Sequence, residues 1–379
     1  MSIPLLICDD SNMARKQVAR SLPDGWDVDI TFATNGEEGI EAIKAGKGDV
    51  LLLDLNMPIM DGYQVLEAIV KEDLPTMVIV ISGDIQPEAH QRVTGLGALD
   101  FIQKPVNKDK LTSILSAYGI YTQQTNETPS VKPEEIPAPN DAVESVKLST
   151  HEHKSASVKF APLTQAADQA IIEKVVSQED FFLDAELRDC YQEIANVAMG
   201  QAGDLLARLL DVFVVLPIPN VNLIEVSELS MALSDVEEQD STSGICQGFI
   251  GAGISGEALL ILNDSSFKDV ASLMNYKYEV DESTELELLM DLANVLIGAC
   301  LNGVAEQLDM TFSQGHPVVL GQHKRISQLI ATNSKKWKRT LAIEISYSIE
   351  DYPIKCDLLL LFTEESMKTL NNKISYLLD

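Results

Sequence analysis

The stretch 50–62 reads VLLLDLNMPIMDG, an apolar run that ends in Asp54 and is followed by a polar turn. A short apolar run bounded by turn residues is typical of a strand buried in a parallel sheet. Outward from it, between Pro4 and about Tyr121, such runs alternate with amphipathic helical stretches. The predicted strands are PLLIC, VDITFA, VLLLD, TMVIVIS and DFIQ, and helices are expected to start near Asn12, Gly36, Gly62, Pro87 and Lys108. Residues 1–122 should therefore form an α/β doubly wound domain with a five-stranded parallel sheet.

Acidic side chains follow two of the predicted strands. Asp9 and Asp10 come after the first strand, and Asp54 closes the third. Because ligands of an open parallel sheet bind at the carboxyl ends of its strands, these carboxylates should converge there. Oxygen ligands of this number suit Mg²⁺, and the backbone carbonyl of Asn56 is expected to add another. The sequence thus predicts a magnesium site built from Asp9, Asp10, Asp54 and Asn56.

Two further side chains point to chemistry at Asp54. Ser82 ends the fourth predicted strand with a hydroxyl, and Lys104 supplies a positive charge after the fifth. A metal ion and an ammonium group would neutralise the oxygens of a phosphoryl group while the Asp54 carboxylate attacks it in line. We therefore predict that Asp54 is a phosphoacceptor contacted by Ser82 and Lys104. The alternative is a domain that keeps this fold but has lost phosphorylation, with the acids merely solvated.

The motifs DD, DLNMPIMDG, SGD and FIQKP together resemble the CheY-like receiver domains of response regulators, over the first 120 or so residues. The resemblance implies phosphorylation of Asp54 with a CheA-like histidine kinase as donor. It also implies that Ser82 and Phe101 move together to report the phosphate, although an aromatic residue on an edge strand can equally have a packing role. Asn56, two residues after the acceptor, is expected to crowd an attacking water, which would create a use for a separate phosphatase.

The composition changes after the first domain. Residues 123–180 are rich in Thr, Pro, Glu, Ser and Lys, with NETPSVKPEEIPAPND near their start, and are predicted to be a flexible linker. A moderately helical stretch near 163–176 is either a docking helix or a nascent one.

Residues 181–379 contain an internal repeat, seen when DCYQEIANVAMGQAG is laid over ELLMDLANVLIGACL. An offset of 98 residues pairs Asn196 with Asn294 and Pro219 with Pro317. We expect a duplicated α+β domain with a pseudo-two-fold axis and repeats at about 184–275 and 282–379.

Three polar residues of the first repeat share one helical face, since Asp189, Glu193 and Asn196 are spaced i, i+4 and i+7. A carboxamide has both a donor and an acceptor, so Asn196 can hold a water for in-line attack on phosphorus. Glu193 can pair with a lysine of an incoming phosphoprotein. Gly200 and Gly203 are expected to permit close packing between two helices.

These residues resemble the motif of the CheC family of CheY-phosphate phosphatases (CheC and CheX are members), matched in full by Asp189, Glu193, Asn196 and Pro219. A second copy, Glu287, Asp291, Asn294 and Pro317, keeps the spacing. It departs from the pattern twice, because Glu287 stands where the family has Asp or Ser, and Asp291 is one methylene shorter than the usual Glu. The resemblance implies a hydrolase whose catalytic residues are Glu193, Asn196, Asp291 and Asn294. For the two prolines we expect a turn role ahead of a strand.

Composition narrows the partners. The chain has 58 acidic residues against 28 Lys and Arg, which disfavours nucleic acid and, with it, a DNA-binding response regulator. Five scattered cysteines fit a cytoplasmic protein, and no apolar run approaches the length of about 20 residues that a membrane span requires. The leading hypothesis is hydrolysis of the aspartyl phosphate of a CheY-type receiver, either a separate protein or Asp54 of the same chain, regulated by phosphorylation of Asp54. The alternative is a non-catalytic adaptor resembling the CheC-like modules of flagellar switch proteins.

Overall fold

The computed structural model describes residues 2–122, 183–225, 241–277, 279–325 and 339–378. Met1–Thr122 and Leu183–Asp379 belong to one compact unit. The predicted linker at 123–180 and the helix expected near 163–176 lie outside the described residues.

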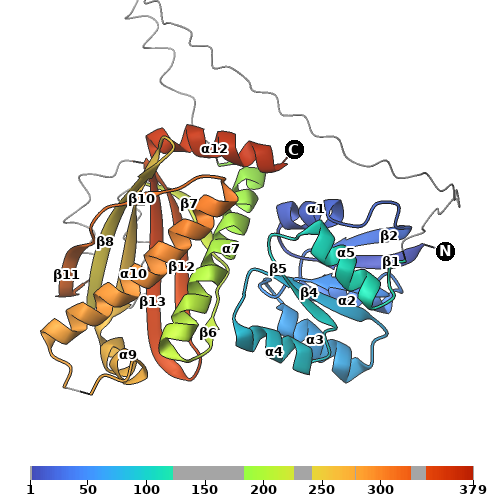
Figure 1. The fold of residues 1–379 in the computed structure, drawn as a ribbon, viewed down its shortest axis with the longest axis horizontal. Coiled ribbons are helices and arrows are strands. Elements are labelled where there is room, and N and C mark those ends of the chain that lie inside the picture. The colour runs from blue at the N-terminus through green and yellow to red at the C-terminus, as the bar shows by residue number, and fades with distance from the viewer. Residues whose placement is uncertain (1, 123–182, 226–240, 278, 326–338, 379) are drawn as a thin grey trace, which may run out of the picture. The chain divides into compact units, whose positions relative to one another are not determined.

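The N-terminal region is the predicted five-stranded parallel α/β domain (Figure 1). Its strands lie in the order β2-β1-β3-β4-β5 and all neighbours are parallel. They are β1 (Ile3–Cys8), β2 (Val28–Ala33), β3 (Val50–Leu53), β4 (Met77–Ser82) and β5 (Asp100–Gln103). The helices are α1 (Asn12–Arg20), α2 (Gly36–Lys44), α3 (Gly62–Glu72), α4 (Pro87–Gly95) and α5 (Lys108–Ala117). All five predicted helix starts are confirmed.

The apolar run that ends at Asp54 is the centre of this domain. Leu51 and Leu53 belong to one buried cluster, and Val50 and Leu52 belong to another. Because successive side chains of a strand point to opposite faces, β3 is buried on both sides of the sheet. The strand that carries Asp54 is therefore fixed by packing.

The C-terminal region is mostly antiparallel sheet with helices. Its first half contains α7 (Ala185–Leu210), β6 (Val214–Val215), β7 (Asn220–Glu225), β8 (Thr242–Gly251), β9 (Ile254–Asn263), the 3-10 turn η1 (Asp264–Ser266) and α9 (Phe267–Leu273). Its second half contains α10 (Glu282–Gln307), β10 (Ser313–Gln314), β11 (Val318–Lys324), β12 (Arg339–Ile349), β13 (Tyr352–Thr363) and α12 (Glu364–Leu378).

The strands of both halves form one eight-stranded sheet of order β10-β8-β9-β13-β12-β6, with β11 paired to β8 and β7 paired to β12. In each half a long helix is followed by two outer strands, a long hairpin and a further helix. The outer strands pair with the hairpin of the other half, as β7 does with β12 and β11 with β8. Neither half therefore completes its own sheet.

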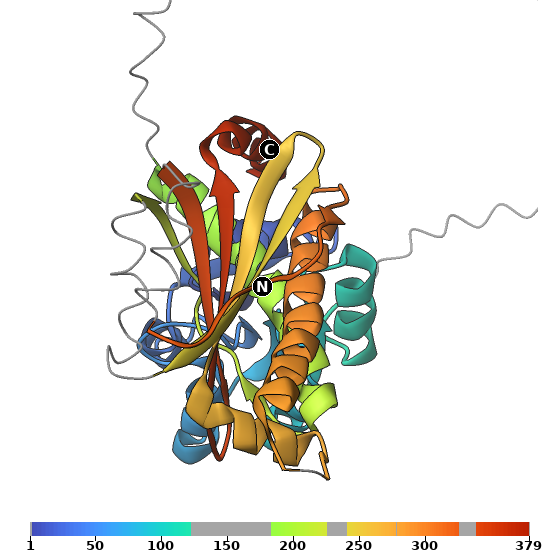
Figure 2. The same ribbon diagram turned by 90° about the vertical axis from the view of Figure 1, so that its left-hand side faces the viewer.

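Helices α7 and α10 lie side by side against one face of this sheet (Figures 1 and 2). Leu206 and Leu296 of the two helices line an apolar cavity of about 10 Å³ with residues of the sheet. The helices cross at Gly303, where an added Cβ would lie 2.7 Å from Ala198 Cα. The expected close packing at Gly200 is confirmed, but its neighbour is the backbone of Gly83 rather than another helix, and Gly203 faces Leu216, so neither glycine marks this helix crossing.

One helix of the described residues, α10, is long and apolar enough to cross a membrane by length and composition, and 67% of its apolar window is buried within the structure. The expectation that no apolar run approaches the length of a membrane span is therefore wrong for this helix. A core helix of a soluble protein has the same length and hydropathy, because a helix that is covered by protein on most of its faces is apolar on most of its faces.

Candidate functional site

Three carboxylates meet at the carboxyl edge of the parallel sheet. Asp9, Asp10 and Asp54 each offer an oxygen, and these oxygens lie within 4.8 Å of one another. Asp9 and Asp54 are buried, whereas Asp10 is partly exposed. Within the described residues Asp54 Oδ1 is fully buried and has no hydrogen bond of good geometry, although Lys104 forms an ion pair with it. An oxygen-only cluster that shares a single ammonium group fits a hard divalent cation such as Mg²⁺. The carbonyl of Asn56 as a further ligand stays a prediction.

Lys104 reaches the same cluster from the end of β5. Its Nζ lies 2.8 Å from Asp9 Oδ2 and 3.3 Å from Asp54 Oδ1. Ser82 is fully buried at the end of β4, and its hydroxyl accepts a hydrogen bond from the Asp84 amide at 3.1 Å. The structure thus brings the predicted charged residues together at Asp54.

Phe101 lies on β5 and is half-buried. Its ring meets the His90 ring edge-on, with 5.6 Å between the ring centroids. This contact is compatible with packing as well as with a switch, so the switch role of Phe101 and Ser82 stays a prediction.

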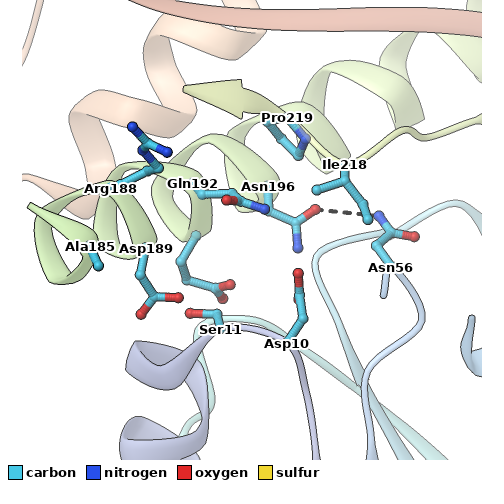
Figure 3. Close-up of a pocket in the computed structure, with 11 residues that line it drawn as sticks. Asp10, Ser11, Asn56, Ala185, Arg188, Asp189, Gln192, Asn196, Ile218 and Pro219 are labelled. Atoms are coloured by element: carbon cyan, nitrogen blue, oxygen red, sulfur yellow. Dashed lines mark hydrogen bonds between the residues drawn. The ribbon is translucent and has the colours of Figure 1, made fainter. Parts of the chain in front are cut away.

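Helix α7 of the C-terminal region covers this cluster. Glu193 and Asn196 are both buried against the loops of the parallel domain. Glu193 Oε1 lies 3.2 Å from Lys104 Nζ. Asn56 Nδ2 donates a hydrogen bond of 3.3 Å to Asn196 Oδ1, drawn as the dashed line in Figure 3. The two residues that the sequence singled out on this helix therefore face the predicted phosphoacceptor of their own chain.

The charges at this contact are not balanced. Burial raises the pKa of Asp54 and Glu193, and it raises the pKa of Asp10 to about 7. Burial acts to lower the pKa of Lys104, but the carboxylates of Asp54, Asp9 and Glu193 raise it well above its usual value. One ammonium group is shared by three carboxylates, so the site holds excess negative charge that a bound cation would relieve.

Asp189, the first residue of the same helical face, binds the N-terminus of α1. Asn12 N donates to Asp189 Oδ1 at 3.0 Å, and Met13 N donates to Asp189 Oδ2 at 2.8 Å. The next amide, of Ala14, donates to Ser11 Oγ at 3.1 Å. The first turn of α1 thus has its amides satisfied partly from another region of the chain.

A pocket of about 180 Å³ lies between α7 and the loops that carry Asp10 and Asn56 (Figure 3). Its lining is mainly polar on both walls: Asp10, Ser11, Asn56, Ala185, Arg188, Asp189, Gln192, Glu193, Asn196, Ile218 and Pro219. Asp10 of the acidic cluster lines this space, which is large enough for several waters.

The partners in the rest of this contact were not anticipated from sequence. An added Cβ on Gly200 of α7 would lie 2.5 Å from the Gly83 carbonyl carbon, so the two backbones touch. Gln86 exchanges two hydrogen bonds with the backbone of Val214, at 2.8 and 2.9 Å. The glycine after Ser82 was a signal for close approach of another chain segment, but it did not indicate which one.

On the outer rim of the same contact, Arg92 of α4 pairs with Glu350, donating to its Oε1 at 2.9 Å. The guanidinium carbon also lies 3.8 Å from the centre of the Phe213 ring. Both are partly exposed groups, so the pair contributes modestly.

The second motif lies on α10 and does not take part in this site. Glu287 and Asn294 are exposed and Asp291 is half-buried. An added Cβ on Gly298, which corresponds to Gly200, meets nothing within 4 Å. The two motif prolines directly precede β7 and β11, as predicted, while their role in a turn stays a prediction.

The parallel domain is similar to domains of known proteins. The family description "Response regulator receiver domain" matches residues 5–116. A protein-glutamate methylesterase/protein-glutamine glutaminase 3 of Geobacter sulfurreducens is 43% identical over 104 residues, which cover 27% of this chain and 28% of that protein. The cell cycle response regulator CtrA of Brucella ovis is 37% identical over 113 residues, 30% of this chain and 48% of that protein. The chain therefore spans less than half the length of these curated relatives.

Among solved structures, Thermotoga maritima FliY is similar with 17% identity and a TM-score of 0.38, over 51% of this chain and 98% of that one. The family match coincides with the parallel sheet, the acidic cluster and Lys104. The N-terminal region of this chain is thus a two-component response regulator receiver domain.

Proposed function

We propose that the C-terminal region is a CheC-like phosphatase domain that hydrolyses aspartyl phosphate, and that its first motif acts on Asp54 of the same chain. The observation that carries the proposal is the contact of α7 with the phosphoacceptor loop, where Glu193 meets Lys104 and Asn196 meets Asn56. A structural helix face would not be expected to bury a carboxylate and a carboxamide against another domain's charged cluster.

The proposed reaction begins with a phosphoryl group on Asp54. A water held by the Asn196 carboxamide attacks phosphorus in line with the bond to the Asp54 oxygen. The new bond is between water oxygen and phosphorus, and the Asp54–phosphorus bond breaks. The water proton passes to a phosphate oxygen, so the products are the Asp54 carboxylate and inorganic phosphate.

The other residues have supporting roles in this proposal. Lys104 stabilises negative charge that develops on the Asp54 side, and Glu193 fixes the position of the ammonium group. Asp9, Asp10 and Asp54 are proposed to hold Mg²⁺, which when bound would neutralise phosphoryl oxygens. The pocket between α7 and Asp10 provides room for the attacking water.

The C-terminal topology supports an internal duplication. The two halves repeat the same order of elements, and each lends its outer strands to the other's hairpin. The two motifs occupy equivalent helices, α7 and α10. In our proposal the exposed motif with Asp291 and Asn294 serves phosphorylated CheY-type receivers of other chains, while a histidine kinase in the cytoplasm phosphorylates Asp54.

Replacement of the amide tests the proposed activity. Asp54 of the full chain is labelled with acetyl phosphate in Mg²⁺, the donor is removed, and loss of the acid-labile label is followed. Asn196→Ala should slow this loss by about 10²-fold or more, since positioned proton transfer and water activation contribute that much. Asn294→Ala is the matched control, because it makes the same change at the exposed motif of α10, and should leave the rate unchanged in dilute chains that meet only their own receiver. An unchanged rate in Asn196→Ala would reject hydrolysis by the first motif, and an unchanged rate in the double variant with Asn294→Ala would reject hydrolysis altogether and leave the adaptor hypothesis.

A further inference from the structure

Asp189 contacts the receiver without contacting Asp54, and the proposed hydrolysis gives it no role. We infer that Asp189 makes α7 the helix that holds the chain's own receiver, because it binds the N-terminus of α1. At the equivalent positions of α10, Glu287 is longer than Asp189 and Asp291 is shorter than Glu193, and these lengths exclude the receiver from α10. The inference deepens the proposed function, since it rests on treating the two helix faces as equivalent and names what decides which one the receiver occupies.

The contact is chemically specific. A helix leaves its first amides without partners inside the helix, and its dipole places partial positive charge at that end. Asp189 supplies both an acceptor and a negative charge at this end of α1, because one of its oxygens accepts from the Asn12 amide and the other accepts from the Met13 amide. Ser11 caps only the following amide, of Ala14. Without Asp189, two amides of α1 would lose a charged acceptor.

The Glu193 carboxylate provides a second point of attachment between α7 and the receiver. Glu193 lies one helical turn beyond Asp189 and reaches Lys104 at the end of β5. The short side chain therefore meets α1 and the long one meets Lys104. Each extra methylene changes the reach of a carboxylate by about 1.5 Å, so both lengths are constrained once the backbones touch at Gly200 and Gly83.

Helix α10 carries these lengths in the opposite order. Glu287 is long where Asp189 is short, and Asp291 is short where Glu193 is long. In the same pose the Glu287 carboxylate would extend too far towards the α1 amides. Asp291 would fall about 1.5 Å short of the lysine, a loss of reach that breaks an ion pair now 3.2 Å long.

The docking of α1 on Asp189 can be measured by hydrogen exchange of two backbone amides. In the full chain the amides of Asn12 and Met13 should be protected, because they donate to Asp189. Asp189→Ala should speed their exchange about tenfold or more, the loss expected for a hydrogen bond to a charged group. The double change Asp189→Glu with Glu193→Asp, which gives α7 the lengths found on α10, should do the same while keeping both charges.

Glu287→Ala is the matched control, since it removes the equivalent carboxylate from α10 and should leave both amides protected. Amides in the middle of α7 serve as an internal reference, because their slow exchange shows that the variant is folded. Unchanged protection of Asn12 and Met13 in folded Asp189→Ala, or in the length-exchange variant, would overturn the inference.

Asn196→Ala separates the inference from the proposed function. That variant should keep both amides protected while it loses hydrolysis. If it keeps protection and also keeps hydrolysis, the proposed activity fails and the docking inference stands. If Asp189→Ala leaves the amides protected, the docking inference fails whatever the rate of hydrolysis.

Discussion

Gly200→Ala should separate the receiver from α7 without harming the helix. The nearest atoms to an added Cβ belong to Gly83 and Asp84 of the receiver, and the Gly83 carbonyl carbon would be 2.5 Å away. Carbon atoms in contact lie about 3.5–4.0 Å apart, so the two backbones must move apart by about 1 Å or more. Within α7 itself, alanine should favour the helix by about 1 kcal/mol relative to glycine.

The displacement has a calculable effect on the proposed hydrolysis. Asn196 lies one turn before Gly200 on α7, so it would move away from Asn56 and Asp54 by a similar distance. A misplacement of about 1 Å can cost about 10²-fold in rate. Gly200→Ala should therefore lengthen the lifetime of the phosphorylated Asp54 by about that factor.

Gly298→Ala is the natural control, since it makes the same change at the equivalent position of α10, where an added Cβ meets open space. It should stabilise the C-terminal region by up to about 1 kcal/mol and leave the phosphate lifetime unchanged. The assay is release of phosphate from chains labelled with acetyl phosphate, with the free energy of unfolding measured in denaturant. A folded Gly200→Ala chain that loses phosphate at the unaltered rate would refute the reasoning that this backbone contact holds Asn196 in place.

Three other outcomes are expected. Asp54→Asn should abolish labelling by acetyl phosphate in Mg²⁺, and an acid-labile label that persists would reject Asp54 as the acceptor. Mg²⁺ at 100 times its dissociation constant should stabilise the folded chain by about 2.7 kcal/mol. Asp10→Asn should remove most of this gain in thermal unfolding. An equal gain in the unaltered chain and in Asp10→Asn would show that the cation binds elsewhere. Hydrogen bonding to Asp264 raises the pKa of His323, so the stability that this pair contributes is complete below the unfolded pKa of His323 and is lost as pH rises through its folded pKa. The contribution should stay below about 1 kcal/mol, because the His323 side chain is 41% exposed. A His323→Gln chain whose stability keeps the same pH dependence above pH 6 would contradict this expectation.

Sequence was sufficient for the receiver because its signals are local. The buried strand before Asp54 needs no partner to be recognised, and the helices follow from the amphipathic stretches between the strands. In the structure Ser11 and Asn35 cap two of these helices, with side chains that accept from the first turn. The carboxyl ends of parallel strands must share one edge. The cluster of Asp9, Asp10, Asp54 and Lys104 was therefore predictable from the sequence.

The spacing of Asp189, Glu193 and Asn196 likewise placed them on one helical face, since the helical period is fixed. It did not say what that face would meet. The complete match favoured the first of two motifs of equal spacing, but it did not tell whether either motif would be buried.

Only the tertiary structure decided that α7 meets the chain's own receiver and that the motif residues Glu287 and Asn294 of α10 remain exposed. That choice depends on surfaces far apart in the sequence: the backbone contact of Gly83 with Gly200, the pairing of Gln86 with Val214, and the capture of α1 by Asp189. Each such contact is a match of shape and hydrogen-bond direction between two folded surfaces. Periodicity and spacing within either segment carry no information about it, because the match exists only once both surfaces have formed.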